Sequence, residues 1–263
     1  MMKQSILICG VAIFLFFGCA NLKDAATIKP SQPVPQQGTE IDPVSVMAVL
    51  KQINSELTSF KGIGRIKIWR PGGLQSTRIV WAGDKTQKMR IEILGIGGRP
   101  FSSVVYDGTR LSVSLHSEGR FYQKQTRQAD LKRLISLPLT VRDAHAILAG
   151  RVPLLEDASL IMEREPSGNQ HILILSKGWF RKKTGKIYLR EDMKTVWKYE
   201  LFQGEDTLLY RVEFLSRKQY GDYQIPDVLV FSNDLQTRLR IDVDSIWPDV
   251  NLSPSVFILK PPG

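Results

Sequence analysis

The period of the apolar residues changes near residue 60 of the chain. Before that point, apolar residues recur every three or four positions: Val46, Leu50, Ile53, Leu57 and Phe60. This spacing places them on one face of a helix. Asp42 can cap that helix, and Pro43 can occupy its first position. The pattern therefore predicts an N-terminal helix with one buried stripe that packs on a sheet.

From Ile63 onward, apolar and polar residues alternate, as in antiparallel strands that bury one face and expose the other. In the first half of the chain, the apolar positions of this alternation include Ile66, Ile68, Met89, Ile91, Ile93, Leu111 and Val113. In the second half, seven runs continue the strand pattern: 160–164, 171–176, 186–190, 196–202, 208–215, 227–231 and 239–243. Three apolar positions in these runs are Tyr210, Val212 and Phe214.

Helical sequence interrupts the alternation between residues 128 and 150. Three residues with helical spacing precede Pro138: Leu131, Leu134 and Ile135. The segment from Thr140 to Asp143 has the form of a capping box, which opens a second helix over residues 141–149. Gly150 is suited to end that helix.

These elements predict an α+β fold built on one large antiparallel sheet. A single sheet of about 11 strands must curl. We therefore expect a curved, unclosed half β-barrel over residues 42–263, with helices that cover its concave side.

The first residues of the chain have the build of an export signal. Lys3 precedes an apolar run from Ile6 to Phe17, which is too short to span a bilayer comfortably. The run ends in Leu15 to Cys19, which resembles the lipobox of bacterial lipoproteins. This resemblance implies that residues 1–18 are removed and that Cys19 carries the lipid anchor. An ordinary signal peptide with a chance cysteine, or a short membrane anchor, remains open.

The residue after Cys19 is Ala20 rather than Asp, which by the same resemblance implies the outer membrane, with the protein facing the periplasm. Residues 19–41 are mostly polar and contain Pro30, Pro33 and Pro35. Such a segment reads as a flexible tether. About 20 residues could extend to about 65 Å. The folded domain could therefore work at some distance from its anchor.

Composition and charge narrow the classes of function. Hydrophobic residues make up 43% of the chain and charged residues 24%, as in a folded globular protein. Of the two cysteines, Cys9 lies in the signal and Cys19 is the lipidation site, so we expect no disulfide. The net charge of +10 would suit nucleic acid, but the export signal argues against that partner. Anionic lipid headgroups or a merely soluble basic surface are the alternatives.

No sequence pattern points to an enzyme, a metal site or a cofactor. The three histidines, His116, His145 and His171, lack metal-ligand spacing. The chain has no Gly-x-Ser-x-Gly elbow, and the glycines of Gly95 to Gly98 lack nucleotide-binding spacing. The basic turn from Arg181 to Lys186 is either a solvated hairpin or a contact for lipid headgroups. We therefore predict a binding protein.

A glycine-rich stretch carries an apolar residue where a turn is expected. Leu94, Ile96 and Phe101 surround the glycines at positions 95, 97 and 98. Ile96 either packs into the core or projects as a hydrophobic finger, because exposed apolar groups mark interaction sites.

The segments that carry a family resemblance are Arg90 to Gly97, Leu134 to Gly150, Ile225-Pro226 and Phe257 to Pro261. They resemble the LolA/LolB superfamily of periplasmic lipoprotein carriers and receptors. The resemblance implies an unclosed β-barrel with a helical lid, whose apolar cavity accepts the acyl chains of lipoproteins without a cofactor. Lipidation at Cys19 makes the chain similar to LolB, the anchored receptor. Ile96 falls where that family has a projecting apolar residue for membrane delivery, next to Leu94.

The resulting hypothesis is an outer-membrane lipoprotein that receives lipidated cargo in an apolar cavity and delivers it to the membrane. Its partners would be acyl chains of lipoproteins or other lipids, and a periplasmic carrier protein. Candidate lining residues are Ile66, Ile68, Met89, Ile91, Ile93, Leu111, Val113, Tyr210, Val212 and Phe214, although each could equally be plain core. The alternative is a structural or assembly lipoprotein that scaffolds an envelope protein complex. A cavity that can hold an acyl chain would favour the carrier hypothesis over the scaffold hypothesis.

Overall fold

The structure is a computed structural model that describes residues 41–70, 73–165, 170–178, 183–204, 206–235 and 237–261. The predicted signal, the lipidation site Cys19 and the tether up to residue 40 lie outside the described residues. So do Arg181 and Lys182 of the basic turn. Within the described part of the chain, every helix is too short or too polar to cross a membrane.

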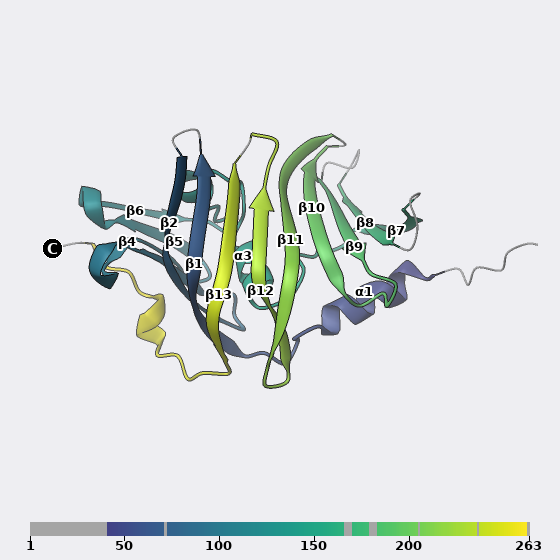
Figure 1. The fold of residues 1–263 in the computed structure, drawn as a ribbon, viewed down its shortest axis with the longest axis horizontal. Helices are drawn as coiled ribbons and strands as arrows, with labels where there is room; N and C mark the ends of the chain where they lie inside the picture. The colour runs from purple at the N-terminus through teal and green to yellow at the C-terminus, as the bar shows by residue number, and fades with distance from the viewer. Residues whose placement is uncertain are drawn as a thin grey trace, which may run out of the picture. The chain divides into compact units, whose positions relative to one another are not determined.

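One antiparallel sheet dominates the described residues, as Figure 1 shows. The first six strands form a meander: β1 (Ser59–Arg70), β2 (Gly73–Asp84), β3 (Met89–Leu94), β4 (Pro100–Tyr106), β5 (Arg110–Leu115) and β6 (Arg120–Gln125). The other seven form a second meander: β7 (Ser159–Arg164), β8 (His171–Lys177), β9 (Lys183–Leu189), β10 (Val196–Gln203), β11 (Thr207–Tyr220), β12 (Tyr223–Ser232) and β13 (Arg238–Pro248).

The two meanders join where β1 pairs with β13, so β6 and β7 are the two edges and the sheet is not closed. The described residues contain 13 strands in this sheet, so the expected number of strands was too low. One strand that the pattern missed is β6. Its side chains are almost all exposed, so its sequence shows no alternation.

The helices are α1 (Pro43–Gln52), α2 (Lys132–Ile135) and α3 (Val141–Leu148), with three short 3₁₀ turns η1 (Ile96–Gly98), η2 (His116–Glu118) and η3 (Pro254–Phe257). The predicted start of α1 is confirmed, because the Asp42 carboxylate accepts hydrogen bonds from the main-chain N–H groups of Val44 and Ser45. The prediction that this helix continues to Phe60 is wrong. The chain turns at Asn54, which has a φ of 51°, and Phe60 lies in β1.

Leu57 and Phe60 are nevertheless buried, because the turn after α1 carries them into the same core. The Asn54 side chain holds this turn by donating hydrogen bonds to the main-chain oxygens of Ala149 and Gln224, both at 2.9 Å. Tertiary hydrogen bonds therefore end the helix where apolar spacing alone would extend it.

The helices cover the inner face of the sheet only in part. Figure 1 shows α3 behind β12 and β13, while α1 lies toward the β7 edge, which it contacts. The predicted cap of α3 is confirmed, since the Thr140 hydroxyl accepts a hydrogen bond from the N–H of Asp143 at 3.0 Å. Gly150 follows with a φ of 77°, which favours glycine.

The junction between the meanders has little room for side chains. The pairing of β1 with β13 shifts register between Ile63 and Gly64. A Cβ added at Gly64 would lie 2.4 Å from the main-chain oxygen of Asp242. Because that oxygen belongs to the partner strand, it cannot move aside without disturbing the junction.

We expect Gly64→Ala to lower the free energy of unfolding by about 3 kcal/mol, because the added methyl overpacks the β1–β13 junction. Gly95→Ala is the matched control. Its φ is −88° and its added Cβ would have no neighbour closer than 3.6 Å, so its cost should stay within about 0.5 kcal/mol. Urea denaturation followed by circular dichroism measures both, and equal stability of the two variants would contradict this account.

Candidate functional site

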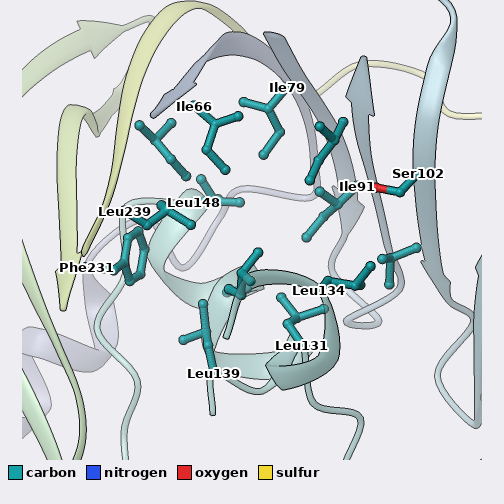
Figure 2. Close-up of a pocket in the computed structure, with 15 residues that line it drawn as sticks. Ile66, Ile79, Ile91, Ser102, Leu131, Leu134, Leu139, Leu148, Phe231 and Leu239 are labelled. Carbon is teal, nitrogen blue, oxygen red and sulfur yellow. The ribbon is translucent and has the colours of Figure 1, made fainter. Parts of the chain in front are cut away.

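An apolar cavity lies between the inner face of the sheet and the segment that contains α2 and α3, as Figure 2 shows. The sheet contributes Ile66, Ile79, Ile91, Ile93, Ser102, Val104, Phe231, Leu239 and Ile241. The helical segment contributes Leu131, Leu134, Ile135, Leu139, Ala144 and Leu148. Among these lining residues, Ser102 alone has a polar side chain. Water-sized molecules can occupy about 50 Å³, and all space between the lining side chains, open mouth included, is about 600 Å³.

Strand register brings the lining residues together. Ile66 on β1 is directly opposite Ile241 on β13. In the other direction, Ile93 on β3 is directly opposite Ile79 on β2 and Ser102 on β4. Residues that are directly opposite in neighbouring strands share a face of the sheet. The cavity wall is therefore assembled from six strands that come from both meanders.

Of the ten predicted lining residues, the structure places Ile66, Ile91 and Ile93 along this cavity. The others lie elsewhere on the inner side of the fold. Five belong to the buried core, namely Ile68, Met89, Tyr210, Val212 and Phe214, and two are half-buried against it, namely Leu111 and Val113. Alternation identifies which face a residue occupies, but it does not identify where that face is left unfilled.

Several lining residues were missed from the sequence. Phe231, Leu239 and Ile241 come from the last two strands, and their place beside β1 depends on a pairing between the two ends of the described chain. The alternation of Leu239 and Ile241 was a usable signal for their face, although not for their neighbours. Leu139 and Ala144 carry no strand pattern and enter the site through the helical segment.

Main-chain hydrogen bonds join the two ends of the segment from residue 129 to residue 141, which we call the lid segment. The N–H of Leu131 donates to the main-chain oxygen of Leu139, and the N–H of Val141 donates to that of Ala129, both at 2.8 Å. An isolated bridge also pairs Asp130 with Thr140. These bonds make the lid segment a compact unit, in which Leu131, Leu134 and Leu139 line the cavity (Figure 2).

His145 anchors α3 beside the lid segment. Its Nε2 lies 2.8 Å from the main-chain oxygen of Asp84, and its ring packs edge-on against Phe60, with 5.1 Å between the ring centroids. The pKa of His145 is lowered from 6.5 to about 4, mainly by burial and also by the nearby charge of Arg151, while the hydrogen bond with Asp84 opposes the shift. The imidazole is therefore neutral at pH 7, as a buried core histidine should be.

The β3–β4 turn projects from the end of the strands that line the cavity. Ile96 is 104% exposed, whereas Leu94 at the end of β3 is half-buried. The interpretation that Ile96 packs into the core is therefore wrong, and the residue projects into solvent. Gly97 and Gly98 have φ values of 77° and 76°, and an added Cβ at either would meet nothing within 4 Å. The turn thus stands clear of the fold.

A second hollow on the outer face is wider but chemically different. Water-sized molecules can occupy about 280 Å³ of it, and its lining includes Lys61, Arg90, Glu92 and Trp247. Arg90 and Glu92 form an ion pair at 2.6 Å. An acyl chain in this hollow would lie against charged groups, so the smaller inner cavity is the better apolar site.

The arrangement most like a catalytic one is a serine next to a histidine. The Ser103 hydroxyl lies 2.8 Å from Nε2 of His116 and 3.2 Å from a carboxylate oxygen of Glu92. Ser103 has 0% exposure, so a substrate cannot reach its hydroxyl. Within the described residues, no group of three or more His, Cys, Asp and Glu side chains is placed to hold a metal ion.

No protein-family model and no curated protein matches this sequence. Solved structures do match it. A LolA superfamily protein from Nitrosomonas europaea has a TM-score of 0.60 at 13% identity, over 83% of this chain and 98% of that one. The chain has a LolA-like fold.

Two further structures agree with this LolA-like fold. A DUF1329 family protein from Desulfovibrio piger has a TM-score of 0.61 at 14% identity, over 82% of this chain and 95% of that one. A domain from Vibrio parahaemolyticus that is named for outer membrane lipoprotein sorting has a TM-score of 0.60 at 9% identity, over 82% and 97%. At these identities the likeness concerns the fold.

We expect the stability of the protein to fall as the pH drops from 6.5 toward 4. The pKa of His145 is about 4 in the folded state and 6.5 in the unfolded state, so protons bind the unfolded state more strongly in this range. The contribution of His145 to stability is complete above pH 6.5, decreases below it and levels off below pH 4. By pH 5 the loss should be about 2 kcal/mol.

Urea denaturation at several pH values measures this loss. His145→Gln keeps a side-chain N–H that can donate to the oxygen of Asp84 but does not titrate. Its stability should be nearly flat between pH 6.5 and 5. A slope as steep as that of the unmodified protein would show that another group is responsible.

Proposed function

We propose that this protein binds acyl chains, of lipoproteins or other lipids, in the cavity beneath the lid segment and delivers them to a membrane. The observation that carries the proposal is the lining itself, in which apolar side chains surround the space and Ser102 supplies one hydroxyl. Such a lining favours hydrocarbon over polar ligands, because each methylene removed from water contributes about 0.8 kcal/mol. Binding of this kind requires no cofactor and no covalent step.

In the described conformation the space beneath the lid segment is narrow. The part of the cavity that is open to water-sized molecules measures only about 50 Å³. An acyl chain therefore enters only if Leu131, Leu134 and Leu139 withdraw from the cavity. The hydrogen bonds that close the lid segment on itself allow it to shift as a unit. The apolar contacts that the leucines lose are then replaced by contacts with the chain.

Release requires a destination that is as apolar as the cavity, and a bilayer provides one. In this proposal Ile96 inserts into the membrane and Leu94 supports the turn, so that the cavity opens beside the lipid. Ile93 lines the cavity only three residues before Ile96. The closeness of the finger and the cavity supports a direct transfer.

A lipid anchor at Cys19 is also part of the proposed function. Acylation at Cys19 would hold the domain beside the outer membrane, facing the periplasm, on a tether that ends at the start of α1. A periplasmic carrier protein would supply the cargo, and the protein would act as a LolB-like receptor. The LolA-like fold supports a carrier or receptor over a catalyst.

Filling the cavity should block binding. Ala144 lies on α3 with 3% exposure and lines the cavity. We expect Ala144→Leu to weaken the binding of a fluorescent fatty acid by about tenfold or more, because the added methylenes occupy the space of the chain. The measurement uses the unanchored Cys19→Ala protein in solution. The matched control is Ala146→Leu, since Ala146 lies on the same helix outside the lining.

Equal affinities for the two variants and the parent protein would overturn the cavity as the binding site. If the parent protein binds no fatty acid and co-purifies with no lipid or lipoprotein, as judged by mass spectrometry, the acyl-chain proposal fails. In that case the scaffold alternative gains, and a stable protein complex isolated from the envelope would support it.

The role of Ile96 in membrane transfer can be tested separately from cargo binding. Ile96→Glu should leave cargo binding unchanged and slow the transfer of a labelled acyl cargo to vesicles by about tenfold, because a carboxylate at the tip resists insertion. Val44→Glu is the control, as Val44 is 64% exposed on α1, which contacts the β7 edge of the sheet. Transfer at the parent rate by the Ile96 variant would remove the finger from the mechanism.

A further inference from the structure

A row of basic residues crosses the outer face of the sheet. Ile66 faces the cavity, so its neighbours Arg65 and Lys67 on β1 point to the opposite face. Register places further cations beside them, and we call this set the basic stripe: Arg65, Lys67, Arg78, Arg238 and Arg240. In Figure 1 this face of β1, β2 and β13 is turned to the viewer, with α3 behind it.

The carboxylates on this face do not balance the basic stripe. Asp242 forms ion pairs with Lys67 at 3.3 Å and with Arg240 at 2.6 Å. Asp244 lies 3.9 Å from Arg78, and both side chains are about half exposed or more, so that pair is loose. Arg65 is exposed and directly opposite Asp242, but among the described residues no ion pair joins it to a carboxylate.

The center of the basic stripe contains a like-charge pair. Arg65 on β1 and Arg78 on β2 are directly opposite each other. Like charges in this position destabilise a sheet unless an anion lies between them. Two guanidinium groups side by side suit a phosphate, which they can bind through paired hydrogen bonds. A phosphate between the two side chains would relieve the repulsion that remains beside Asp242 and Asp244.

The basic stripe is continuous with exposed apolar groups. Arg78 is directly opposite Leu94, the residue that leads into the turn of Ile96. Phe101, which is 50% exposed, lies on the other side of this turn, with its Cβ 3.6 Å from a Cβ added at Gly95. A cationic surface that borders an exposed isoleucine and phenylalanine matches the two layers of a bilayer surface, phosphate and hydrocarbon.

We propose that the basic stripe is a docking surface for anionic phospholipid, with Arg65 and Arg78 on headgroup phosphates and Phe101 beside Ile96 in the interface. This inference deepens the proposed function, since it names the membrane surface on which delivery takes place. Ile96 alone would insert into any bilayer. The basic stripe would make the protein prefer bilayers with anionic headgroups. The apolar border favours a membrane over nucleic acid, which offers phosphate without accessible hydrocarbon.

The test compares vesicles of phosphatidylcholine with vesicles that also contain phosphatidylglycerol, using the Cys19→Ala protein in a sedimentation assay. The parent protein should prefer the anionic vesicles and lose this preference at high salt. The double variant Arg65→Gln/Arg78→Gln should bind anionic vesicles about tenfold more weakly. Its melting temperature should not fall, because a like-charge pair has been removed.

The matched control is Arg127→Gln/Lys194→Gln, which has the same net charge change at exposed positions near the opposite ends of the strands. If both double variants bind anionic vesicles equally weakly, the loss is explained by net charge alone, and the proposed docking site is overturned. Equal binding of the parent protein to both kinds of vesicle would overturn it too, as would equally tight binding to duplex DNA.

The outcomes separate this inference from the proposed function. Fatty-acid binding in solution should be the same for the parent protein and Arg65→Gln/Arg78→Gln, because the basic stripe is on the face opposite the cavity. Failure of the parent protein to bind fatty acid would refute the cavity and leave the vesicle result standing. A parent protein that binds fatty acid but ignores anionic vesicles would refute the docking surface alone.

Discussion

The pairing of β1 with β13 is the constraint on which the rest of the structure depends. It joins two meanders that are each continuous in sequence, and it brings Ile66 and Ile241 to opposite sides of one junction. Without it, Phe231, Leu239 and Ile241 would not share one cavity wall with the residues of β1 to β4. The absence of a side chain at Gly64 lets the two backbones approach at the shift in register. The cavity is thus a consequence of a long-range pairing.

Alternation gives the two faces of the same strands different chemistry. Along β1, Ile66 faces the cavity while Arg65 and Lys67 face outward. The inner face offers contacts to hydrocarbon, and the outer face presents cations at a spacing set by the strands. A container for acyl chains and a surface for anionic headgroups can therefore be built from one set of strands. The proposed docking surface would give part of the excess of basic residues a role beyond solubility.

In the proposed function, the lid segment moves while the sheet stays in place. Its hydrogen bonds close on themselves at Leu131 and Leu139, while His145 holds the helix that follows it against the β2–β3 turn. The lid segment faces the sheet across the cavity with the apolar side chains of Leu131, Leu134 and Leu139. Apolar contacts are non-directional and an acyl chain can replace them. Hydrogen bonds to the sheet would have to be broken without replacement.

Local patterns in the sequence determined much of this protein. Asp42, Thr140 and Gly150 mark the helix ends that the structure has, because caps act within a few residues. The alternation along the strands assigned residues such as Ile66 and Ile91 to the inner face, because side chains on a strand alternate strictly. The sequence also predicted the glycine-rich turn around Ile96, but not whether Ile96 packs into the core or projects into solvent.

Tertiary structure alone decided which inner residues border a space and which fill the core. Tyr210 and Ile91 have the same pattern in the sequence, but Tyr210 is fully buried in the core and Ile91 borders the cavity. The difference depends on where the lid segment lies and on the pairing of β1 with β13. Both are contacts between residues far apart in the chain, and a periodicity of two residues carries no information about them.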